Sequence, residues 1–156
     1  MPAEKTIDTD IHRAAAVQTH GETWGLLEKA DRTPEDDERL IHTAHTSCYH
    51  WLHAGTAVHR QRGEWLISRV YATLGLGEAA VRHARRCAEI TASSPEGLED
   101  FDHAFALEAL ARSHAVAGEA ELATRYRIQA KEAGEMIKSE DDRVYFLGDL
   151  EGGRWS

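Results

Sequence analysis

Apolar residues recur every three to four positions along most of the chain, the spacing that places side chains on one face of an α-helix. Alanine is abundant and runs of β-branched residues are absent, which also favours helix. The pattern predicts helices at about 9–29, 34–54, 58–74, 78–91, 100–117, 119–138 and 141–150. We therefore expect an all-α fold.

Short polar or glycine-containing segments separate the predicted helices. Thr33 and Pro34 are typical of an N-cap and a first helical position, and the acidic residues after them complement the helix dipole. Segment 92–99 is the longest connection, and GGRWS at 152–156 predicts a tail. The first helix is expected to pack through an apolar stripe made of Ile11, Ala14, Val17, Trp24 and Leu27.

A repeat is visible in the middle of the chain. The first copy contains Tyr71, Gly75 and Ala80, and residues 43 positions later in the second copy are His114, Gly118 and Ala123. Cys87 and Ala130 correspond at the same offset. Small residues let two helices approach closely, and a glycine permits the tight turn between them.

This pattern resembles the tetratricopeptide repeat, in which an aromatic residue, a turn glycine and two packing alanines recur across a helix–turn–helix. The resemblance covers 64–131 and implies a right-handed solenoid or bundle of stacked antiparallel helix pairs. The family's unit is about 34 residues, so the extra length is expected in segment 92–99. The stretch from Ala44 to Gly75 also looks like a group of short, uncharacterised bacterial helical-repeat proteins, a resemblance that implies no activity.

The resulting organisation is one helical-repeat domain over 1–156. It consists of an N-terminal helix pair at about 9–54, repeat-like units at about 58–91 and 100–138, and a C-terminal helix at about 141–150. A composition of 42% hydrophobic and 29% charged residues is typical of a globular protein. No apolar run approaches the roughly 20 residues of a membrane helix, and the first ten residues are too polar for a signal peptide. We expect a cytoplasmic protein that does not bind membranes.

The charge balance argues against nucleic acid as a partner. The chain carries 27 acidic and 18 basic residues, for a net charge of −9, whereas binding to nucleic acid depends on neutralising phosphates. The local basic strip formed by Arg82, Arg85 and Arg86 is interpreted as a solvated helix face. Cys48 and Cys87 fall on apolar helix faces and are predicted to be free, buried thiols.

Histidine is unusually frequent, with ten residues in the chain. One interpretation is a flank of amphipathic histidines that form hydrogen bonds between helices, and it requires no cofactor. The alternative is a transition-metal site for zinc, iron or copper, serving a sensor or a small metalloenzyme. Its ligands would come from His42, His45, Glu64, His83 and Glu108. The HTAH segment lacks the glutamate of the HExxH zinc motif.

Several polar residues occupy positions with apolar surroundings. His83 shares a helix face with Cys87, and Glu108 and Arg112 stand four residues apart in the fifth helix. A buried polar group needs a hydrogen-bond partner, so one interpretation is an internal network that pairs Glu108 with Arg112 and Glu64 with His83 or His45. The other is a ligand-binding groove, because the first helix of each pair in such solenoids usually lines the concave surface.

The predicted function is a binding module that docks a protein or peptide partner, or a small ligand, on its concave face. The candidate binding residues are Glu64, Ser68, Tyr71, Glu108, Arg112, Trp51 and Trp65. The chain has no nucleophile elbow, phosphate-binding glycine loop or dinucleotide fingerprint, so the sequence assigns no catalytic residue. About three helix pairs are near the minimum for a stable stack, which favours a homodimer that covers an exposed end.

Overall fold

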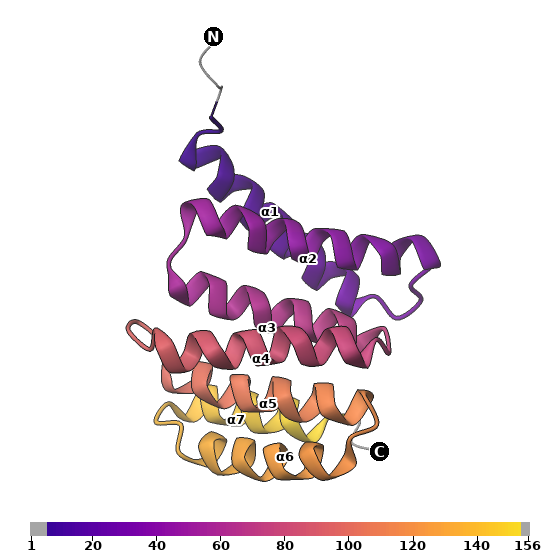
Figure 1. Cartoon of the computed structure of the whole chain (residues 1–156), viewed down its shortest axis with the longest axis vertical. Coiled ribbons are helices and arrows are strands. Elements are labelled where there is room, and N and C mark those ends of the chain that lie inside the picture. Colours follow the sequence, from indigo (N-terminus) through magenta and orange to yellow (C-terminus); the bar gives the residue numbers. More distant parts are fainter. Residues whose placement is uncertain (1–5, 154–156) are drawn as a thin grey trace.

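The computed structural model describes residues 6–153, and the regular secondary structure of this span is entirely α-helical (Figure 1). The helices are α1 (Thr9–Glu28), α2 (Pro34–Ala54), α3 (Ala57–Thr73), α4 (Gly77–Ser93), α5 (Asp100–Val116), α6 (Ala120–Glu135) and α7 (Glu140–Glu151). The all-α prediction is confirmed, and each helix boundary lies within three residues of its predicted position. Residues 1–5 of the polar N-terminal segment and residues 154–156 of the predicted tail lie outside the described residues.

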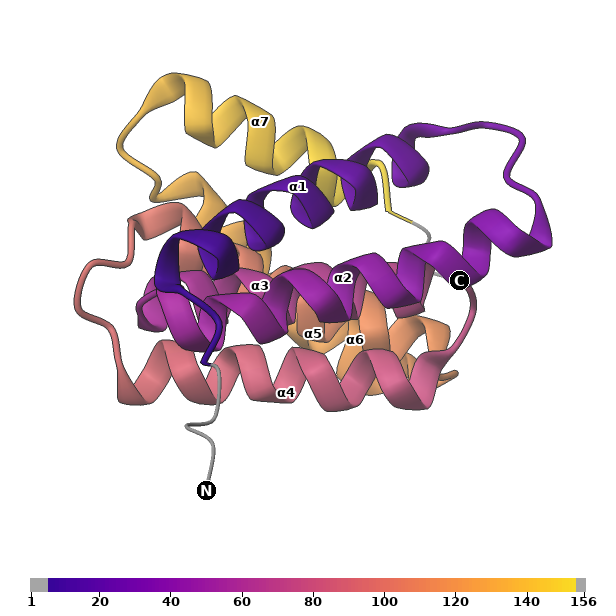
Figure 2. The same ribbon diagram turned by 90° about the horizontal axis from the view of Figure 1, so that it is seen from above.

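The helices form a stack of antiparallel neighbours (Figure 1). α1 packs on α2, α3 on α4 and α5 on α6, while contacts of α2 with α3 and of α4 with α5 join the three pairs. α7 packs against α5 and α6. Viewed from above, α1 and α7 lie on the same side of the stack (Figure 2). The odd-numbered helices therefore meet on one face, where α3 and α5 lie between α1 and α7.

The turns that follow α3 and α5 have the same geometry. Gly75 and Gly118, the glycines of the 43-residue repeat, have φ angles of +77° and +79°. The residue after each glycine caps the C-terminus of the helix, because its backbone amide donates a hydrogen bond to the carbonyl five residues earlier. These bonds run from Leu76 to Tyr71 and from Glu119 to His114, both at 2.9 Å. A positive φ is a conformation that glycine adopts at little cost, which explains this residue at both positions.

Small buried residues bring the helices close together. Completely buried alanines occur in α1, α4, α5 and α6, at Ala16, Ala80, Ala84, Ala104, Ala111 and Ala130. Larger apolar side chains fill the spaces between helix pairs, with one cluster around Leu40, Ile67 and Val70 and another around Ile137 and Phe146.

The apolar stripe predicted for the first helix is wrong in part. Ile11 and Val17 are 60% and 57% exposed, whereas the buried residues of α1 are His12, Ala16 and Thr23. The α1–α2 interface is closed by hydrogen bonds of small polar side chains. Thr23 donates to the Thr43 hydroxyl at 2.9 Å, and Ser47 of α2 donates to the Ala16 carbonyl at 2.8 Å. A hydrophobicity pattern does not identify an interface of this kind.

Candidate functional site

A network of ionic groups, centred on a buried glutamate, joins α3, α5 and α7. Glu108 is 1% exposed, and its carboxylate accepts hydrogen bonds from the Trp65 indole N–H at 3.0 Å and from the Nε of Arg112. Arg69 Nη2 lies 3.5 Å from the same carboxylate and donates to Asp149 of α7 at 2.5 Å. The predicted pairing of Glu108 with Arg112 is therefore present, as part of a larger network.

The charges of this network balance. Two guanidinium groups, of Arg69 and Arg112, face two carboxylates, of Glu108 and Asp149. Nearby, Arg62 forms a bidentate ion pair with Asp102 through two hydrogen bonds of 2.9 Å. Burying a charge without a partner is costly, so the pairing explains how α3, α5 and α7 hold charged groups at their interface.

Aromatic side chains form a cleft next to this network, on the face shared by the odd-numbered helices. We call it the aromatic cleft. It has a volume of about 260 Å³, and its eleven lining residues come from α1, α3, α5 and α7. Its aromatic residues other than histidine are Trp24, Trp65, Phe101, Phe105 and Tyr145. Arg62 and Asp149, members of the two ionic groups, line it as well.

Five rings in the cleft form a continuous row across the four odd-numbered helices. The centroid distances are 6.4 Å from His20 to Trp24, 5.9 Å from Trp24 to Trp65, 5.4 Å from Trp65 to Phe105 and 6.3 Å from Phe105 to Tyr145. Tyr145, at the end of the row, is 66% exposed. The row therefore combines partly buried rings with an accessible tyrosine at the surface.

Trp65 was predicted as a binding residue from the sequence, whereas the other residues of this row were not. The signal that could have found it is a second periodicity. Trp24, Trp65, Phe105 and Tyr145 follow one another at spacings of 41, 40 and 40 residues. Because each repeat of helix–turn–helix returns the chain to the same face of the stack, aromatic residues at this spacing occupy equivalent positions on successive odd-numbered helices.

A second polar cluster lies between α2, α3 and α4. His83 Nδ1 is 2.6 Å from a Glu64 carboxylate oxygen, so the predicted pairing of these residues is present. His45 Nε2 is 2.8 Å from the Tyr71 hydroxyl, and the Tyr71 ring stacks on that of His83 with a centroid distance of 5.6 Å. Burial, together with the nearby His83, lowers the pKa of His45. Burial also raises the pKa of the Cys48 thiol to about 12, helped by the Glu64 charge, which leaves this thiol un-ionised at neutral pH.

The other predicted binding residues do not line the aromatic cleft. Ser68 is 1% exposed, donates to the Ala80 carbonyl at 3.0 Å and is 2.8 Å from the Ser113 hydroxyl. Trp51 stacks on His59 at a centroid distance of 4.1 Å. Glu64 and Tyr71 belong to the second cluster, and Arg112 lies beneath the cleft in the network of Glu108. The structure thus separates the predicted binding set into several places.

The residues of the metal alternative are also divided. His45, Glu64 and His83 come together, whereas Glu108 is held by the arginine network and the His42 side chain is 74% exposed. Among the residues that the structure describes, no three His, Cys, Asp or Glu side chains are arranged to hold one metal ion.

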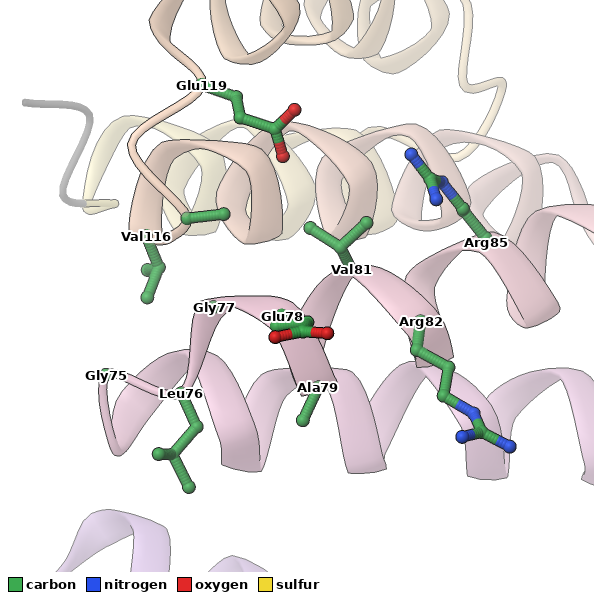
Figure 3. A pocket seen from close by; sticks show the side chains of 11 residues that line it. Gly75, Leu76, Gly77, Glu78, Ala79, Val81, Arg82, Arg85, Val116 and Glu119 are labelled. Carbon is green, nitrogen blue, oxygen red and sulfur yellow. The ribbon is translucent and has the colours of Figure 1, made fainter.

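A hollow of about 1000 Å³, larger than the aromatic cleft, lies beside the turns after α3 and α5. It contains no aromatic residue, and its charged side chains do not converge: Arg82 and Arg85 extend in different directions (Figure 3). Gly77 approaches Ala117 so closely here that an added Cβ would lie 2.5 Å from the Ala117 Cα. This hollow follows from the contact of two turns, and we do not treat it as a site.

Comparison of the chain with protein-family models, with curated proteins and with solved structures gave no match. None of the described helices combines the length and apolar character needed to cross a membrane. Function is therefore inferred from the geometry of the chain's own residues.

Proposed function

We propose that the protein is a helical-repeat binding module that docks a peptide segment of a partner protein in the aromatic cleft. The observation that carries this proposal is the continuous row of rings contributed by α1, α3, α5 and α7. Aromatic residues dominate the energetics of protein interfaces because they bury a large area at a low cost in conformational entropy. The row ends at Tyr145, which is 66% exposed, and an accessible ring at this position fits the role.

The size of the cleft favours a peptide over a complete small molecule. Pockets for small molecules usually have volumes of about 300–1,000 Å³, whereas this cleft encloses about 260 Å³. Such a volume accepts one or two apolar side chains. The row of rings extends the contact surface across four helices, which provides room for neighbouring residues of the same peptide.

The support beneath the cleft favours binding without rearrangement. Glu108 fixes the Trp65 indole through a hydrogen bond of 3.0 Å, and the guanidinium of Arg69 lies 5.0 Å from the centroid of the same ring. Since the arginines and carboxylates around the cleft are already paired with one another, a ligand need not supply a charge. A pre-organised apolar surface of this kind loses little entropy on binding.

The proposal can be tested with a phage-displayed library of random dodecapeptides selected on the wild-type protein. Enriched peptides are synthesised with a fluorophore, and their affinities are measured by fluorescence polarisation at neutral pH. Tyr145→Ala removes an exposed ring of the row and should weaken binding by about tenfold or more, as expected for an interface hot spot. Trp24→Ala should have a similar effect.

The matched control is Tyr49→Ala, which removes a 54% exposed tyrosine of α2 outside the cleft. It should leave the affinity of the selected peptides unchanged. Circular dichroism and thermal unfolding of each variant establish that it is folded. Selection that enriches no peptide, or peptides that bind Tyr145→Ala and Trp24→Ala as tightly as the wild type, would overturn the proposal.

A further inference from the structure

Three histidines meet where α1 begins and α2 ends, and we call them the three-histidine cluster: His12, His50 and His53. The His12 side chain belongs to α1 and the residue is only 5% exposed. Its Nδ1 lies 2.7 Å from the Nδ1 of His50, a hydrogen-bond distance. The ring of His53 stacks on the ring of His12, with a centroid distance of 4.3 Å and an interplanar angle of 13°. The cluster thus holds the first half of α1 against the last turns of α2.

The hydrogen bond between the two Nδ1 atoms limits how many protons the cluster can hold. One ring must donate an N–H and the other must present a lone pair, so at least one of the two imidazoles has to be neutral. Protonation of both rings would replace an attraction by the repulsion of two cations. In agreement with this, the pKa of His12 is lowered, mainly by burial and then by the neighbouring His53 and His50.

The other groups around the cluster do not offset this repulsion. Tyr49 contacts His50 and His53 through its ring, at centroid distances of 5.4 and 5.1 Å. Arg13, the next residue after His12, is itself a cation and donates to the Ala54 carbonyl at the end of α2 at 3.5 Å. The carboxylate of Asp8 accepts a hydrogen bond from the Asp10 backbone amide and thereby caps the N-terminus of α1. Among the described residues, no ion pair joins a carboxylate to any of the three rings. The first turn of α1 is also the positive end of the helix dipole, which opposes a charge on His12.

We propose that the three-histidine cluster is a proton-sensitive latch that holds the N-terminal half of α1 on α2 at neutral pH and releases it below about pH 6, where histidine gains a proton. The second half of α1 stays attached through contacts that do not titrate, such as the hydrogen bond from Thr23 to Thr43. The release is therefore local, and its result is a freed helical segment together with the surface of α2 that it covered.

Hydrogen exchange detected by mass spectrometry tests the latch in the full chain without any ligand, so its outcome is independent of the peptide-docking proposal. Exchange is measured between about pH 7.5 and pH 5.5 and expressed as protection factors, which removes the intrinsic effect of pH on exchange. A group protonated only in the opened state changes the opening equilibrium by at most about tenfold per pH unit. We expect protection in residues 12–18 to fall by about tenfold or more over this range, while protection in α5 changes little.

Two variants, His12→Gln and His50→Gln, each remove one imidazole of the hydrogen-bonded pair. In each, the pH dependence of protection in residues 12–18 should be largely lost, and His50→Gln carries the test if His12→Gln fails to fold. His42→Gln, which changes a side chain of α2 that is 74% exposed, should behave as the wild type. His20→Gln is needed as a second control, because burial lowers the pKa of His20 on the same helix. Constant protection of α1 in the wild-type protein, or an unchanged pH response in His50→Gln, would overturn the latch.

Discussion

The Trp65 indole N–H donates a 3.0 Å hydrogen bond to the Glu108 carboxylate, and this bond joins the buried ionic network to the aromatic cleft. Trp65 lies in the middle of the row of rings, whereas Glu108 is 1% exposed beneath it. The network that stabilises the packing of α3, α5 and α7 therefore also fixes the orientation of a ring in the proposed binding surface. Stability and binding are linked at this pair.

Replacing Glu108 should destabilise the protein strongly. In Glu108→Ala, the guanidinium groups of Arg69 and Arg112 would lose the carboxylate that both contact, and removal of one member of a buried ion pair typically costs about 3–5 kcal/mol. The free energy of unfolding from urea titrations measures this effect. The control is Glu89→Ala, whose carboxylate is 66% exposed in an ion pair with Arg86 and should change stability by less than about 1 kcal/mol. Similar losses in the two variants would contradict the proposed importance of the network.

The positions of the helices were predictable because their signals are local. Apolar periodicity, the Thr33 cap and the turn glycines at 75 and 118 all act within a few residues of the boundary that they define. Part of the polar chemistry was also predictable. Glu108 and Arg112 are one helical turn apart, and His83 in an apolar face requires a partner, which the structure supplies as Glu64.

The remainder of the site depends on contacts between distant segments. Arg69 and Asp149 are 80 residues apart, and neither position shows by local pattern that it faces the other. Trp24 looked like a core residue because a single helix does not reveal which of its faces will be covered by a neighbour. The exposed Ile11 and Val17 were assigned to the core for the same reason, since α1 packs instead through His12, Ala16 and Thr23.

Two glycine substitutions should change stability in opposite directions. At Gly25 an added Cβ meets nothing within 4 Å, so Gly25→Ala should stabilise α1 by about 0.5–1 kcal/mol through its higher helix propensity. At Gly77 the same methyl group would lie 2.5 Å from the Ala117 Cα, and Gly77→Ala should separate the turns and destabilise the stack. Thermal unfolding of both variants measures the effects. A Gly77→Ala protein as stable as the wild type would show that the turns are not in close contact.

The two cysteines should be unreactive in the folded protein. Burial raises the pKa values of both the Cys48 and Cys87 thiols, and that of Cys48 to about 12, while the thiolate is the reactive species. Labelling with Ellman's reagent at about pH 8 should proceed only as fast as the protein opens, and it should accelerate to the rate of a free thiol in denaturant. Rapid labelling of Cys48 in the native protein would show that the interface between α2 and α3 is accessible.

Stability in acid should depend on Asp36 at the start of α2. Its carboxylate accepts hydrogen bonds from Lys29 at 2.6 Å and from the Thr33 amide at 3.2 Å, and these partners lower its pKa below the ordinary value of 3.8. For an acid with a lowered pKa in the folded state, the stabilisation is fully present above the unfolded value and is lost as the pH falls through the folded value. Asp36→Asn should therefore reduce the urea midpoint at neutral pH, and the difference from the wild type should disappear toward about pH 2. Glu35→Gln, an exposed change in the same helical turn, serves as the control for the helix dipole and should have a smaller effect at neutral pH. If the midpoints of Asp36→Asn and the wild type were equal at every pH, the capping box and the Lys29 ion pair would contribute nothing to the stability of this helix start.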